Sequence, residues 1–140
     1  MVYVLDFEEI PKLGSFVNKF INIDFTKRKS LNLACKRFQR IYQEYNVEDQ
    51  LIDCMIAFEA LFLKGERRAS SRGKIIAIAC STLLGSNDEE REEIKNTLSM
   101  AYSMRNSIVH GGECRKDVNL FEVVEDVIEY LRQSIIKFLD

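Results

Sequence analysis

The only histidine of the chain, His110, closes the run Arg105 to His110 (RNSIVH) and is followed by two glycines. Arginine and histidine are well suited to act on a phosphodiester without a metal, because a guanidinium can stabilise phosphate charge while an imidazole transfers protons near neutral pH. The two residues stand five positions apart. That spacing alone is a weak signal, so its meaning depends on the elements that position the pair.

The spacing predicts which of these side chains share a helix face. Residues four apart lie on one face, so Asn106 aligns with His110, and Tyr102 lies one turn further back on the same line. Five residues correspond to about 140° of rotation, which places Arg105 on a different face from His110. The alternative interpretation of His110 is a histidine that only interacts with the C-terminal end of a helix dipole before a glycine.

Length and composition predict one soluble helical domain. The chain has 140 residues, of which 46% are hydrophobic and 30% charged, with one proline, six glycines and no tryptophan. This composition disfavours a turn-rich β fold. No apolar run reaches the length of a membrane span, and the N-terminus lacks a basic region followed by an apolar stretch. We therefore expect a cytoplasmic protein without a membrane partner.

The cysteines give little reason to expect a metal site. They show no C-x2-C spacing, and only one histidine is available, so a structural zinc site is disfavoured. We expect no metal and no cofactor, and small buried or half-buried thiols at Cys35, Cys54, Cys80 and Cys114. Cys114 lies in a polar loop near His110, which leaves a redox or catalytic role open for it. The chain also lacks a glycine-rich phosphate loop and a Ser/His/Asp arrangement.

Hydrophobic periodicity and capping residues predict an all-α protein, an up-and-down bundle of about five to six helices. Asn46 is a candidate N-cap of the third helix, and Gly111 a candidate stop for the fifth. The expected helices span residues 11–21, 30–45, 46–63, 70 or 71 to 84, 87 or 88 to 110, and 119–139. Within a single domain overall, residues 26–140 form the bundle. Residues 1–25 form an N-terminal segment with the short first helix, and residues 2–5 are either a short strand or irregular.

Three charged side chains fall on apolar helix faces. Helical wheels place Arg105, Glu59 and Arg72 in line with the apolar stripes of the fifth, third and fourth expected helices. A buried charge must be paired or hydrogen-bonded. One possibility is that Glu59 pairs with either arginine and only holds the helices in register. The other is that two arginines facing one carboxylate leave a guanidinium for a phosphate. Asp53, at the edge of the third helix's stripe, could cancel this excess by supplying a second acid.

Basic residues gather on the second expected helix. No acid occurs between Asp24 and Glu44, and the wheel places Lys29, Lys36 and Arg40 opposite the apolar stripe. Such a face is either merely solvated or follows a phosphate backbone. The candidate RNA-binding residues are Lys29, Lys36, Arg37 and Arg40, with Arg67, Arg68, Arg72 and Lys74 as further guides for a substrate.

The sequence resembles the ApeA-like group of the HEPN superfamily of small helical domains. The resemblance is carried by residues 57–61 (AFEAL), by Arg72, and above all by residues 102–111 (YSMRNSIVHG). The family signature is an arginine, a polar residue directly after it, and a histidine four to six positions after the arginine. Arg105, Asn106 and His110 satisfy all three requirements. The resemblance covers roughly residues 30–138 and does not explain the first 25 residues.

The resemblance implies a helical bundle that dimerises and, in active members, cleaves RNA without a metal. In that chemistry the ribose 2′-hydroxyl attacks the adjacent phosphate and gives a 2′,3′-cyclic phosphate and a free 5′-hydroxyl. His110 would act as base or acid, Arg105 would stabilise charge on phosphorus, and Asn106 would orient the imidazole or the phosphate. Tyr102, Glu59 and Arg72 would support the site.

One histidine cannot be base and acid at the same moment, so a two-fold homodimer that brings two copies of His110 together is expected. We thus expect a ribonuclease of the toxin or host-defence type, with RNA as substrate and an antitoxin or a fused partner domain as possible controls. The alternatives are a non-catalytic module that binds RNA or a nucleotide, and a dimerisation domain belonging to a longer polypeptide.

Overall fold

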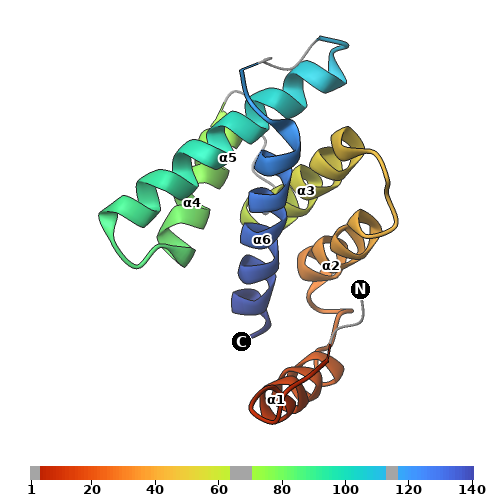
Figure 1. The fold of residues 1–140 in the computed structure, drawn as a ribbon. Coiled ribbons are helices and arrows are strands. Elements are labelled where there is room, and N and C mark those ends of the chain that lie inside the picture. The colour runs from red at the N-terminus through yellow and green to blue at the C-terminus, as the bar shows by residue number, and fades with distance from the viewer. Residues whose placement is uncertain (1–3, 64–70, 113–116) are drawn as a thin grey trace.

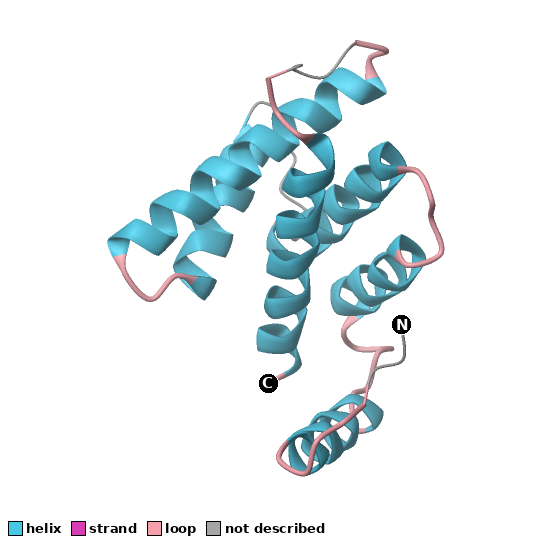
Figure 2. Cartoon of the chain, in the orientation of Figure 1, coloured by secondary structure: helices cyan, strands magenta, loops and turns pink. Residues whose placement is uncertain are grey.

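The computed structural model of the protein describes residues 4–63, 71–112 and 117–140, and these segments form helices without a strand (Figures 1 and 2). The predicted all-α fold is confirmed. The helices are α1 (Glu9–Ile21), α2 (Lys29–Ile41), α3 (Val47–Phe62), α4 (Arg72–Leu84), α5 (Asp88–Val109) and α6 (Leu120–Leu139). The predicted end of α2 at residue 45 was wrong, since the helix stops at Ile41. For the short strand considered at residues 2–5, Val4 and Leu5 are not in a strand, and residues 2 and 3 lie outside the described residues.

Asparagine side chains begin three of the helices. Asn46, Asn87 and Asn119 each accept a backbone N–H of the first turn of α3, α5 and α6, which satisfies a donor that has no partner within the helix. Ser71 stands at the N-cap of α4 but makes no such side-chain bond, and Ser70 lies outside the described residues. The caps explain why the sequence located these helix starts closely.

Two helices hold the bundle together. α3 contacts α2, α4, α5 and α6, and α6 contacts α2, α3, α4 and α5. In addition, α4 packs closely against α5, and α2 packs closely against α3. Figure 1 shows α6 running down the middle of the bundle, with the α4–α5 pair on one side and the α2–α3 pair on the other. The core therefore lies around α3 and α6, where Phe58, Leu51 and Leu131 are fully buried.

The spacing of Ile76, Ala79 and Leu83 predicted the apolar stripe of α4, which was right for Ile76 and wrong for Leu83. The buried residues are Ile76, Ala77, Cys80 and Ser81, whereas Leu83 is 37% exposed. The helix is apolar almost all round between residues 75 and 84, so its own sequence does not distinguish one face from another. Contacts with α3, α5 and α6 decide which side is covered.

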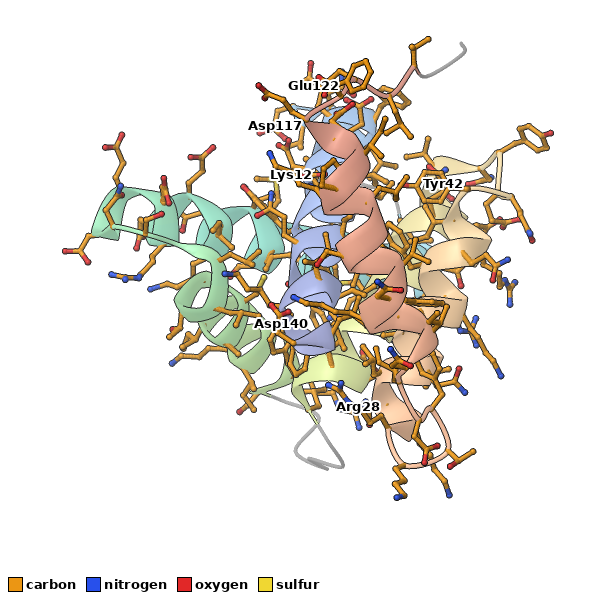
Figure 3. All side chains as sticks on the ribbon, turned by 90° about the horizontal axis from the view of Figure 1, so that it is seen from below. Lys12, Arg28, Tyr42, Asp117, Glu122 and Asp140 are labelled. Carbon is orange, nitrogen blue, oxygen red and sulfur yellow. The ribbon has the colours of Figure 1, made fainter. Side chains whose placement is uncertain are left out.

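Helix α1 stands apart from this core. It buries none of its residues, although one side of it is rich in aromatic side chains. Phe16 stacks on Phe20 with 6.2 Å between ring centroids, and Phe20 meets Phe25 edge-on at 5.5 Å. Figure 3 shows α1 lying across α2 and α6, where Lys19 pairs with Asp140. Among the described helices, none is both long and apolar enough to cross a membrane.

Two phenylalanines test how far the fold depends on each region. Phe58 is 0% exposed and Phe20 is 39% exposed. We expect Phe58→Ala to lower the free energy of unfolding by about 3–5 kcal/mol, because it leaves a cavity in the core, and Phe20→Ala to lower it by less than about 1.5 kcal/mol. Chemical denaturation measures both. Equal losses would contradict the view that α1 is peripheral.

Candidate ribonuclease site

The motif histidine lies at the end of α5. His110 follows the last helical residue, its backbone N–H donates to the carbonyl of Asn106 over 3.1 Å, and its side chain is exposed. Gly111 has a φ of 76°, a left-handed conformation that favours glycine, so the predicted stop is confirmed. The imidazole is therefore open to a substrate or to another copy of the chain. Cys114 lies outside the described residues.

Arg105 is held by its neighbours on the same helix. It is half-buried, its Nη1 donates to Asn106 Oδ1 over 3.1 Å, and its Cζ lies 5.8 Å from the centre of the Tyr102 ring. The apolar stripe of α5 is continued at this level by Met104, which is 3% exposed. Arg105 follows buried Leu98 and Ala101 at helical spacing, in line with the stripe as predicted, but it is only half-buried. Its guanidinium packs near an aromatic ring, where a cation is stabilised.

Glu59 on α3 contacts both Tyr102 on α5 and Arg72 on α4. The Tyr102 hydroxyl donates to Glu59 Oε1 over 3.4 Å, and Arg72 Nη1 lies 4.0 Å from Glu59 Oε2. Of the two pairings left open by the sequence, Glu59 therefore takes Arg72. We call Glu59, Arg72, Tyr102 and Arg105 the α3–α5 charge cluster, after the helices α3, α4 and α5 that supply it.

The charged groups of the cluster act in opposite directions on the pKa of Tyr102. Burial, followed by the charge of Glu59, raises the pKa of the Tyr102 phenol, while Arg105 and Arg72 act in the opposite direction. The phenol therefore stays neutral and available as a donor. Two guanidiniums and one carboxylate act on the Tyr102 phenol. The Nε atoms of both Arg72 and Arg105 are buried without a hydrogen-bond partner in the described part of the chain.

A glycine that the motif analysis did not single out allows this cluster to form. A Cβ at Gly73 would lie 2.6 Å from Cδ1 of Tyr102, so the ring occupies the space that a side chain would need. Gly73 is the second residue of α4, directly after Arg72. A glycine inside a helix lowers stability relative to alanine. Its presence near the start of the predicted fourth helix was therefore the sequence feature that could have indicated a close approach of another helix.

The second acid of α3 serves a different partner. Asp53 is 4% exposed and lies 3.0 Å from Arg37 Nη1 and 3.8 Å from Arg40 Nε. It therefore leaves the excess of arginine around Glu59 unchanged. Of the expected RNA-binding residues, Arg37 and Arg40 therefore pair with Asp53, while Lys29 and Lys36 are exposed. Arg67 and Arg68 lie outside the described residues.

The described thiols fit the expectation of small, unreactive side chains. Burial raises the pKa of Cys54 strongly, with Asp53 adding to the effect, and burial raises the pKa of Cys80 to about 11 against a bond to Ser134. Cys35 is half-buried, and burial raises its pKa as well. Thiols with raised pKa values are poor nucleophiles. Among the described residues, no cluster of histidine, cysteine and carboxylate side chains could hold a metal ion.

Two cavities lie away from the motif residues. One of about 790 Å³ is lined mainly by apolar side chains of α1, α2 and α6, including Phe16, Phe20 and Ile135. A cavity of about 390 Å³ lies beside the basic residues 27–29 at the start of α2. Neither of them includes Arg105, Asn106 or His110.

The contact between Gly73 and Tyr102 has a direct test. We expect Gly73→Ala to lower the free energy of unfolding by about 1–3 kcal/mol, because the added methyl overlaps the ring. The cost should largely disappear in a Tyr102→Ala background. Gly14→Ala in α1, where nothing lies within 4 Å, is the matched control and should stabilise slightly. An unchanged cost in the Tyr102→Ala background would contradict the packing described here.

No protein-family model, curated protein or solved structure matches this chain. The likeness to HEPN domains therefore depends on the motif residues and their arrangement, and the assignment is a proposal.

Proposed function

We propose that the protein is a metal-independent endoribonuclease of the HEPN type. The observation that carries the proposal is the end of α5, where a half-buried arginine bonded to Asn106 stands five residues before an exposed histidine. These side chains match the requirements of phosphodiester cleavage: a fixed cation for the phosphate and an accessible group that exchanges protons near neutral pH.

The proposed reaction uses the RNA's own hydroxyl as nucleophile. The 2′-oxygen forms a bond to phosphorus and gives up its proton to a base, while the bond from phosphorus to the 5′-oxygen breaks and an acid protonates that oxygen. Arg105 stabilises the negative charge on the phosphoryl oxygens in the transition state. Because Asn106 Oδ1 accepts from Arg105, the amide orients the guanidinium and leaves its own N–H groups for the phosphate.

The need for a base and an acid at once supports a homodimer. Each chain has one histidine, so two copies of His110 in one cleft would fill both roles. Val109 and Phe121 are 51% and 57% exposed. They belong to the end of α5 and the start of α6, which lie at the same end of the bundle in Figure 1. We propose this end as the dimer interface.

The same resemblance supports a toxin or host-defence role in the cytoplasm, under the control of an antitoxin or a fused partner domain. Exposed Lys29 and Lys36 would add non-specific attraction for the RNA backbone. The second candidate is a non-catalytic module that binds RNA or a nucleotide. It is favoured by one observation: Arg105 already has Asn106 as a partner, so the guanidinium is not free of protein contacts.

Cleavage of RNA in the presence of EDTA tests the chemistry. We expect His110→Ala and Arg105→Ala each to lower the rate by about 10²–10⁴-fold, as the loss of a proton-transfer group or a charge-stabilising group does. Lys95→Ala, an exposed change on the same helix, should retain full activity. Products should end in 2′,3′-cyclic phosphate, and DNA should resist cleavage. Activity that persists in both motif variants would refute the proposal, and RNA binding without cleavage would favour the second candidate.

A mixing experiment tests the shared site. When wild-type protein is equilibrated with an excess of His110→Ala protein, activity should fall as the square of the wild-type fraction, because both copies of His110 are needed. Sedimentation analysis of the same mixtures measures the dimer. A fall in direct proportion to the wild-type fraction would show that a single histidine suffices.

A further inference from the structure

Within the described part of the chain, the α3–α5 charge cluster holds two arginines and one carboxylate. Among the described residues, Tyr102 is influenced by two arginines and one carboxylate, and Asp53 is engaged by α2. Both arginine Nε groups are buried without an acceptor among residues 4–63, 71–112 and 117–140. An unsatisfied buried donor costs about 1–3 kcal/mol, and two such donors around one tyrosine are unusual in a stable fold.

The ion pair within the cluster leaves most donors unused. Arg72 Nη1 is 4.0 Å from Glu59 Oε2, beyond hydrogen-bond distance, and a guanidinium carries five N–H groups. The Arg72 side chain is 36% exposed, so an incoming acceptor can reach it. Glu59 therefore acts as a resident counter-ion that holds Arg72 only loosely.

The position of Arg72 adds to its positive potential. It is the first residue of α4, whose N-cap Ser71 makes no side-chain bond and whose first turn contains no acid. The backbone dipole at this end of the helix is therefore not offset by a local carboxylate. Gly73 lets α4 approach α5, which runs beside it in Figure 1, and so brings Arg72 into the electrostatic surroundings of Tyr102. Arg105 is already there, because it lies on α5 with its guanidinium near the Tyr102 ring.

We propose that Arg72 is a second phosphate-binding residue, which together with Arg105 binds a phosphate group of the ligand in competition with Glu59. A tetrahedral phosphate offers several oxygens and can accept bonds from two guanidiniums, which a single carboxylate satisfies less well. Displacement of Glu59 from Arg72 accompanies binding. The inference rests on the proposed function, since Arg105 serves in both.

The test uses the full chain and ligands that cannot be cleaved. Binding of a fully 2′-O-methylated RNA oligonucleotide is measured by calorimetry, and binding of inorganic phosphate by NMR titration. We expect Arg72→Gln to weaken binding about tenfold, the usual effect of losing one charged contact. Glu59→Gln, in contrast, should tighten binding several-fold, because it removes the competing anion. Arg91→Gln, which removes an exposed arginine from α5, is the matched control and should change neither ligand's affinity.

The direction of the Glu59→Gln effect separates ligand binding from a structural role. If the pair with Arg72 only holds the helices in register, both variants weaken binding together with stability, and the inference is overturned. Unchanged binding in Arg72→Gln would overturn it as well. Arg72→Lys preserves the charge with fewer fixed donors and should lie between wild type and Arg72→Gln if folding is intact.

The outcomes also distinguish this inference from the proposed function. Arg72-dependent binding of the methylated RNA, with no cleavage of unmodified RNA, would sustain the phosphate site and reject the ribonuclease. Cleavage that needs His110 but is unaffected by Arg72→Gln would do the reverse. Arg72-dependent binding of inorganic phosphate without RNA binding would sustain the site and identify a free phosphate or phosphomonoester as its ligand.

Discussion

The contact between Gly73 and the Tyr102 ring sets the geometry on which the candidate site depends. Because α4 has no side chain at this point, it approaches α5 closely enough for Arg72 and Tyr102 both to reach Glu59 on α3. The close packing of α4 on α5 thereby determines which charged groups lie together. Three helices that meet through an apolar core also meet through charged groups, and such groups are tolerated near a core only when they have partners or a ligand.

Two acids of helix α3, Asp53 and Glu59, pair with arginines of different helices. Asp53 and Glu59 are six residues apart, which corresponds to a rotation of about 240°, so they lie on different sides of the helix. Asp53 pairs with arginines of α2, while Glu59 belongs to the α3–α5 charge cluster. The two acids differ in consequence. Asp53 is nearly enclosed and engages two arginines, whereas the Glu59 pair is looser and more exposed, as expected of a contact that a ligand can replace.

The proposed chemistry follows from the difference between Arg105 and His110. Arg105 is half-buried and oriented by Asn106, while His110 is exposed beyond the last helical turn. A preorganised cation suits a site that must stabilise developing charge. An exposed imidazole suits a group that exchanges protons, and it is also accessible to a second copy of the chain. One chain on its own therefore has one of the two imidazoles that the proposed reaction uses.

Local features of the sequence determined the helices, the asparagine caps and the glycine stop at Gly111, because each depends on hydrogen bonds or steric limits within a few residues. The sequence also identified Glu59 and Arg72 as charges that need partners. Only the tertiary structure decided that Glu59 pairs with Arg72, that Asp53 takes the arginines of α2, and which side of α4 is buried. Those outcomes depend on distances between helices, and a contact such as that of Gly73 with Tyr102 sets these distances across residues far apart in the chain.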